Sequence, residues 1–321
     1  MNSGGLMSEN PSRRSRDSDW VAASSGLTSA AVIAFTEGPA ADAEGNVFFS
    51  DIANNRIMKL SAAGVLSVFR EDSGRTNGNM FDRQGRLVSC EGSESGPGGR
   101  RRLVRTDMES GEIEVLSDRF EGRRYNSPND LVIDRQGRIY FTDPCYGDRS
   151  IMEMQEEAVY RIDPDGTVVR VLQQPAIQRP NGITLSPDDR TLYVVDSNPQ
   201  PGGNRKIWAF DIQEDDELAN QRVVYDFSPG RGADGVRVDA RGNLWAAAGI
   251  KMPRGEGETG LNPPGIYVVS PTGELLGFID VPEDVITNLT FGGPGKRTAY
   301  ITAGKALFRI DLSVAGHTIY P

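Results

Sequence analysis

The fold is decided by one stretch of sequence, Asn129-Asp-Leu-Val-Ile-Asp-Arg-Gln-Gly-Arg-Ile-Tyr-Phe-Thr-Asp143. It has a polar first residue, a short apolar run, a Gly-containing turn and a second apolar run. Short runs rich in Val, Ile, Tyr and Phe and bounded by turn residues are typical of β-strands. We therefore interpret the stretch as two antiparallel strands joined by a tight turn.

The same pattern occurs five more times in the 321-residue chain, starting at Glu37, Asn77, Asn181, Asp234 and Thr287. Successive starts are 40 to 53 residues apart, and periods of about 40 to 50 residues with several strands per unit are typical of propeller blades. Each unit continues with a third and a fourth strand, such as 158–163 and 168–172. The sequence thus predicts an all-β, six-bladed β-propeller with four-stranded antiparallel blades around a central channel.

Residues 1–25 differ from the rest, since they are rich in Ser, Arg, Asn and Asp and contain no hydrophobic run. We interpret them as a disordered N-terminal extension. The propeller, which we expect to be the catalytic domain, then covers residues 26–321. The Arg13-Arg14 pair is not followed by the apolar segment of an export signal, so we expect a cytoplasmic protein.

Composition narrows the possible partners. The chain is 37% hydrophobic and 25% charged, which is normal for a soluble protein with a buried core. A net charge of −10 argues against nucleic acid or an anionic membrane as partner. Two cysteines cannot form a disulfide framework, and no window approaches 18 consecutive apolar residues. We expect a monomer or homodimer whose partner is a small molecule.

The strand register predicts where the polar starts of the repeats lie. In a propeller, the first strand of each blade lines the channel, and side chains alternate along a strand. Apolar pairs two and four places after each start, such as Leu131/Ile133 and Val236/Val238, are therefore expected on the same face as the start. The six starting residues are all polar, and we expect them to form a ring at one mouth of the channel: Glu37, Asn77, Asn129, Asn181, Asp234 and Thr287.

Such a ring has the chemistry of a metal site. Two carboxylates and several amide oxygens are hard ligands that suit Ca²⁺, while the absence of Cys and His from the ring disfavours softer ions. Zn²⁺, Mn²⁺, Mg²⁺ and Fe²⁺ stay open as alternatives. The single histidine, His317, is expected on an outer strand, which leaves no Ser-His-Asp triad. One Asn-Gly pair often serves only as a turn, but six equivalent polar positions favour a site.

The chain also carries short segments that match a known family: Phe35-Thr-Glu-Gly-Pro39, Asn126-Ser-Pro-Asn-Asp-Leu131, Tyr140-Phe-Thr-Asp-Pro-Cys-Tyr-Gly147, Arg179-Pro-Asn-Gly-Ile183, Ala233-Asp-Gly-Val236 and Phe291-Gly-Gly293. In these segments it resembles the SMP-30/gluconolactonase/luciferin-regenerating enzyme family.

The resemblance implies one catalytic divalent ion in the axial channel, held by Glu37, Asn129, Asn181 and Asp234. Asn129 would bind directly or through water, and Asp234 would also be the base. Animal members carry a substrate-contacting Arg where this chain has Ser127, so the chain resembles the gluconolactonase branch instead.

The expected reaction is hydrolysis of a sugar-acid lactone such as glucono-1,5-lactone, which makes the protein a carboxylic ester hydrolase. The metal would polarise the lactone carbonyl and activate water, and Asp234 would accept the proton. Asp130 is a second candidate base, because glycine takes its place in four of the other five repeats. It is equally a candidate supporting partner of Asn129 or a turn cap.

Long loops after the second strands, at 91–102, 144–157, 197–205 and 249–264, are expected to form the substrate pocket. The candidate substrate contacts are Asn77, Ser127, Tyr146, Arg101 and Thr287. Two other functions stay open: an organophosphate phosphotriesterase on the same site, and a propeller that binds without catalysis.

Overall fold

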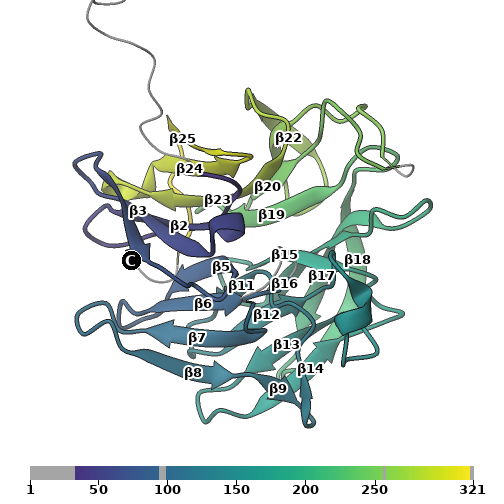
Figure 1. The fold of residues 1–321 in the computed structure, drawn as a ribbon. Helices are drawn as coiled ribbons and strands as arrows, with labels where there is room; N and C mark the ends of the chain where they lie inside the picture. The colour runs from purple at the N-terminus through teal and green to yellow at the C-terminus, as the bar shows by residue number, and fades with distance from the viewer. Residues whose placement is uncertain (1–32, 94–98, 256–257, 319–321) are drawn as a thin grey trace, which may run out of the picture. The chain divides into compact units, whose positions relative to one another are not determined.

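The predicted repeats fold as six antiparallel sheets arranged in a ring (Figure 1). The computed structural model describes residues 33–93, 99–255 and 258–318, so the extension predicted over 1–25 lies outside the described residues. The described chain belongs to one unit that starts at Ile33. None of its helices has the length and apolar character needed to cross a membrane.

The first three sheets pair their strands in chain order. The first contains β1 (Thr36–Ala41), β2 (Val47–Asp51), β3 (Arg56–Leu60) and β4 (Leu66–Arg70). The second contains β5 (Thr76–Phe81), β6 (Leu87–Glu91), β7 (Arg102–Thr106) and β8 (Ile113–Ser117). The third contains β11 (Leu131–Ile133), β12 (Ile139–Asp143), β13 (Ala158–Ile162) and β14 (Val168–Leu172).

The other three sheets follow the same order. The fourth contains β15 (Pro180–Leu185), β16 (Thr191–Ser197), β17 (Arg205–Ile212) and β18 (Leu218–Asp226). The fifth contains β19 (Ala233–Val238), β20 (Leu244–Ala248), β21 (Gly265–Val269) and β22 (Leu275–Asp280). The sixth has three strands within the described ranges, β23 (Ile286–Gly292), β24 (Thr298–Ala303) and β25 (Ala306–Asp311).

The remaining elements are short. A two-stranded ribbon and three 3₁₀ turns complete the described structure: β9 (Arg119–Phe120), β10 (Arg123–Arg124), η3 (Ile52–Asn54), η4 (Arg149–Ile151) and η5 (Pro294–Lys296).

The first strands of the six sheets close into a ring. Strand β1 contacts β5 and β23, β11 contacts β5 and β15, and β19 contacts β15 and β23. Hydrogen bonds join the last blade to the first, because Thr36 N donates to Gly304 O at 2.8 Å and Thr287 Oγ1 lies 2.9 Å from Thr36 O. The predicted six-bladed β-propeller is confirmed.

Each inner strand is disturbed by a β-bulge near its start. In the third blade, Asn129 N donates to Thr142 O at 2.9 Å and Thr142 N donates to Asp130 O at 3.0 Å. Asn129 and Asp130 on the inner strand therefore both lie opposite the single residue Thr142 on the next strand. The registers shift in the same way between Glu37 and Ala40 in the first blade, and at equivalent places in the others. A bulge reverses the alternation of side chains beyond it.

This reversal makes the predicted channel face wrong for the first member of each apolar pair. Third-position residues do not continue the channel face of the ring; they are fully buried in four separate hydrophobic clusters: Leu131, Ile183, Val236 and Leu289. Fourth- and fifth-position residues both line the channel pocket: Val132 and Ile133, Thr184 and Leu185, Arg237 and Val238, and Thr290 and Phe291. The third-position residues therefore stabilise the blades, and the channel contains polar as well as apolar groups.

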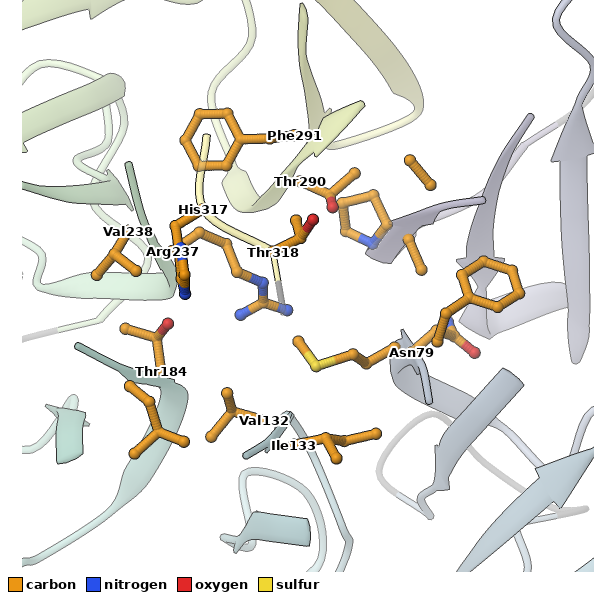
Figure 2. Close-up of a pocket in the computed structure, with 16 residues that line it drawn as sticks. Asn79, Val132, Ile133, Thr184, Arg237, Val238, Thr290, Phe291, His317 and Thr318 are labelled. Carbon is orange, nitrogen blue, oxygen red and sulfur yellow. The ribbon is translucent and has the colours of Figure 1, made fainter. Parts of the chain in front are cut away.

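A pocket opens at the mouth opposite the ring, and Figure 2 shows Arg237 projecting into it beside His317. His317 does not lie on an outer strand as predicted. The chain turns back after β25, Gly316 pairs with Asp239, and His317 N donates to Val238 O at 3.0 Å. No residue of the predicted ring lines this pocket, so it is separate from the candidate active site.

Candidate metal centre and active site

Three predicted ligands come together at the other mouth. Glu37, Asn181 and Asp234 lie at the starts of β1, β15 and β19. The Asn181 amide lowers the pKa of the Asp234 carboxyl group, and the charge of Asp234 raises the pKa of Glu37. Glu37 is 4% exposed and Asn181 6%, so the site is largely shielded from water.

Asn129 and Asn77 occupy the adjoining blades. Asn129 is 5% exposed, and its main-chain carbonyl oxygen accepts a hydrogen bond from Gly78 N at 2.7 Å. Asn77 is 7% exposed, and its Oδ1 is buried without a hydrogen-bond partner among the described residues. A buried polar atom without a partner is costly, which is consistent with a ligand or water that completes this site.

Glycines allow the strands to approach at the ring. Gly38 has a φ of +44°, and a Cβ there would lie 2.1 Å from Asn77 O. A Cβ on Gly182 would lie 2.4 Å from Asp234 O. Larger side chains would push neighbouring blades apart, so glycine after the ring residue keeps the polar side chains close together.

The electrostatics of the ring favour a bound cation. Burial, and then the charge of Asp234, raise the pKa of Glu37 well above its ordinary value, although Gly38 N donates to Oε2 at 2.8 Å. Burial raises the pKa of Asp234 to about 6, against the lowering effect of Arg231. Two neighbouring buried carboxylates repel each other, and a divalent ion would neutralise that charge.

The donor set fits such an ion. Carboxylate and amide oxygens are the ligands that Ca²⁺ prefers. No group of three or more His, Cys, Asp or Glu side chains that could hold a metal occurs in the part of the chain that the structure describes.

Asp130 lies in the channel, where it forms an ion pair. Arg237 Nη1 and Nη2 donate to its two carboxylate oxygens at 2.9 and 3.0 Å. Asn288 Nδ2 and Leu131 N add contacts at 3.3 and 2.9 Å. Asp130 is 1% exposed, and its oxygens are occupied by these donors. Its partners are Arg237, Asn288 and Leu131 rather than Asn129, and this arrangement favours a structural role over that of a general base.

Tyr146 contacts the ring directly. Its hydroxyl accepts a hydrogen bond from Asn181 Nδ2 at 3.0 Å and donates to Ser197 O at 3.2 Å. The Arg179 guanidinium lies 5.4 Å from the centre of the Tyr146 ring. Burial and the charge of Asp234 raise the pKa of Tyr146 well above its ordinary value, so the hydroxyl is protonated at neutral pH.

The other predicted substrate contacts are engaged within the fold. Ser127 is fully buried, and its Oγ accepts a hydrogen bond from Ser93 N at 2.9 Å. Arg101 is 7% exposed and donates from Nε to Tyr125 O at 2.6 Å. The Thr287 hydroxyl lies between blades, as described above. These hydrogen bonds hold all three side chains to other parts of the fold.

The sequence reasoning missed Arg231. Its Nη2 lies 3.0 Å from Asp234 Oδ2, and its Nη1 donates to Gly249 O at 3.4 Å. Its Nε is 3.9 Å from Glu258 Oε1 in the predicted pocket loop. Arg231 precedes Asp234 by only three residues, and that proximity was the signal available in the sequence.

Comparisons with known proteins place the chain in a family. The family model described as SMP-30/Gluconolactonase/LRE-like region matches residues 35–305. The chain is 32% identical to a gluconolactonase of Zymomonas mobilis, over 88% of this chain and 80% of that protein.

Two solved structures are also similar. A gluconolactonase from Xanthomonas campestris is 33% identical with a TM-score of 0.73, covering 88% of this chain and 87% of that one. A calcium-binding protein, regucalcin, from Agrobacterium tumefaciens is 18% identical with a TM-score of 0.69, covering 90% and 93%; that likeness shows the fold alone. With the family model matching most of its length, the chain belongs to the SMP-30/gluconolactonase/LRE-like family.

Proposed function

We propose that this chain hydrolyses a sugar-acid lactone such as glucono-1,5-lactone, with one divalent metal ion, Ca²⁺, held in the ring. The expected enzyme class, a hydrolase acting on cyclic esters, is confirmed by the gluconolactonase relatives. The observation that carries the proposal is the buried pair of Glu37 and Asp234 with the amide of Asn181 beside them.

The residues of the site would have separate roles. Glu37, Asn129, Asn181 and Asp234 would hold the ion. A divalent ion there would supply Lewis-acid polarisation of the lactone carbonyl and lower the pKa of water. Asp234 would accept a proton from the attacking water as the oxygen bonds to the carbonyl carbon. It would return that proton to the ring oxygen when the ester C–O bond breaks, leaving a hydroxy acid.

The pKa of Asp234 suits this role. Without a bound ion the value is about 6, so the carboxylate is ionised at neutral pH, yet basic enough to take a proton. Arg231 supports the ionised form through its contact at 3.0 Å. The same guanidinium lies beside the loop 249–264, where it could meet the hydroxyl groups or the product carboxylate of a sugar acid.

A substrate panel tests the proposal. Turnover of glucono-1,5-lactone, other aldonolactones and a fluorophosphate would be followed by acid release at constant pH with Ca²⁺ present. Preferred turnover of an aldonolactone, lost in Asp234→Asn, is expected. If only the fluorophosphate were hydrolysed, the protein would be a phosphotriesterase rather than a lactonase. If no member of the panel were hydrolysed, only the alternative of a propeller that binds without catalysis would remain.

A further inference from the structure

The side-chain amide of Asn181 is oriented by its neighbours. Oxygen and nitrogen of an amide have similar shapes, so the hydrogen-bond network decides which atom faces which way. Tyr146 Oη lies 3.2 Å from the carbonyl oxygen of Ser197, which can only accept. The Tyr146 hydroxyl must therefore donate its single proton there. Towards Asn181, 3.0 Å away, the same oxygen can only accept, which assigns Nδ2 to that side.

The second contact of Asn181 gives the same orientation. Its amide also lowers the pKa of the neighbouring Asp234 carboxyl group; an ionised carboxylate accepts hydrogen bonds only, so the NH₂ group is the part of the amide that stabilises it. The NH₂ group thus serves both Tyr146 and Asp234. The carbonyl oxygen Oδ1 is the atom left for another ligand.

Tyr146 is itself held firmly. Its ring packs against the Arg179 guanidinium at 5.4 Å. Arg179 Nε donates to Glu157 Oε1 at 2.9 Å, and Cys145 N donates to the same oxygen at 2.7 Å. Glu157 is 2% exposed, so this ion pair is shielded from water. The Glu157 carboxylate thereby joins both ends of the loop 144–157, and Arg179 holds the Tyr146 ring in place.

We propose that Tyr146 is a positioning residue that selects the metal-binding orientation of Asn181. The inference rests on the proposed function, because it assigns the ligand atom as Asn181 Oδ1. A reversed amide would present NH₂ hydrogens to a cation, which is repulsive. Tyr146 was expected to contact substrate; here it acts on the metal site through Asn181.

The test measures Ca²⁺ affinity directly, on the full-length chain stripped of metal, by isothermal titration calorimetry. Tyr146→Phe removes only the hydroxyl. We expect its Ca²⁺ dissociation constant to rise by about 10-fold or more, as for partners of metal ligands in general. Tyr125→Phe is the matched control, because it also loses one hydroxyl hydrogen bond, to Ser117 at 2.7 Å, away from Asn181. Its affinity should stay unchanged, and circular dichroism would verify that both variants fold.

A second background separates orientation from general support. In Asn181→Asp, a carboxylate presents oxygen whichever way it turns, so adding Tyr146→Phe should change Ca²⁺ affinity by less than about 2-fold. An unchanged affinity in the single variant Tyr146→Phe would overturn the inference. An equal loss of Ca²⁺ affinity in the wild-type and Asn181→Asp backgrounds would also overturn it, because the effect of Tyr146 would then not depend on the orientation of an amide. A wild-type chain that binds no divalent ion would instead overturn the metal site itself.

Discussion

Replacing Arg231 by Gln should move the acid side of the pH–activity profile to higher pH. Arg231 Nη2 lies 3.0 Å from Asp234 Oδ2, with side-chain exposures of 18% and 13%. Its positive charge lowers the pKa of Asp234 against the raising effect of burial, and the balance is a value of about 6. Without that charge the pKa of Asp234 rises. The carboxylate is then protonated, and can no longer act as the base, at a higher pH than in the wild type.

The size of the shift follows from the contact. A hydrogen bond to a charged group is worth about 1.5–3 kcal/mol when well shielded. Partial exposure of this pair places it just below that range, at about 1.4 kcal/mol, which equals about one pKa unit. The acid limb of kcat/KM should therefore lie about one pH unit higher in Arg231→Gln than in the wild type.

The assay is kcat/KM for glucono-1,5-lactone between pH 5 and 8 at saturating Ca²⁺, corrected for spontaneous hydrolysis. Arg254→Gln is the matched control, because Arg254 is an exposed arginine of the loop 249–264, beside which Arg231 lies; its profile should overlay the wild type. An acid limb that stays in place in Arg231→Gln, or moves to lower pH, would refute the reasoning.

Three further changes should have separable effects. Asp234→Asn should reduce kcat by at least ~100-fold and abolish the Ca²⁺-dependent rise in Tm, both read from one preparation by steady-state assay and calorimetry; retained turnover would exclude Asp234 as the base. Glu37→Gln should stabilise the metal-free protein at pH 7, because a folded-state pKa above the unfolded value of about 4.3 makes stability fall as pH rises between the two. The Tm of metal-free Glu37→Gln should rise by roughly 2 °C for each kcal/mol of stabilisation, while its Ca²⁺ binding weakens. A Tm at or below that of the metal-free wild type would contradict the repulsion between Glu37 and Asp234. Arg237→Ala should cost about 3–5 kcal/mol in urea unfolding, since it leaves Asp130 buried and unpaired; combining it with Asp130→Ala should recover part of the loss, and no recovery would count against the pair.

The propeller could be predicted from the sequence because its signal is repeated. Polar starts at a regular spacing, alternating apolar runs and turn glycines are local features, and each copy supports the others. The predicted third and fourth strands at 158–163 and 168–172 appear as Ala158–Ile162 and Val168–Leu172. The gathering of polar residues at one mouth follows from the same repeat.

The details of the channel could not be predicted in the same way. A bulge depends on how one strand pairs with its partner, so the alternation of side chains after Asn129 was assigned to the wrong face. The ion pair between Asp130 and Arg237 joins residues 107 positions apart, and no local pattern indicates it. His317 was misplaced because the return of the chain after β25 is a tertiary feature.

The most direct test of the metal site is lactone turnover as a function of bound Ca²⁺. The chain would be stripped with a chelator, its residual metal quantified by mass spectrometry, and Ca²⁺ restored stepwise while glucono-1,5-lactone hydrolysis is followed. We predict loss of turnover on stripping and full recovery that saturates at one ion per chain. Full turnover by the stripped chain, with metal far below one ion per chain, would contradict it.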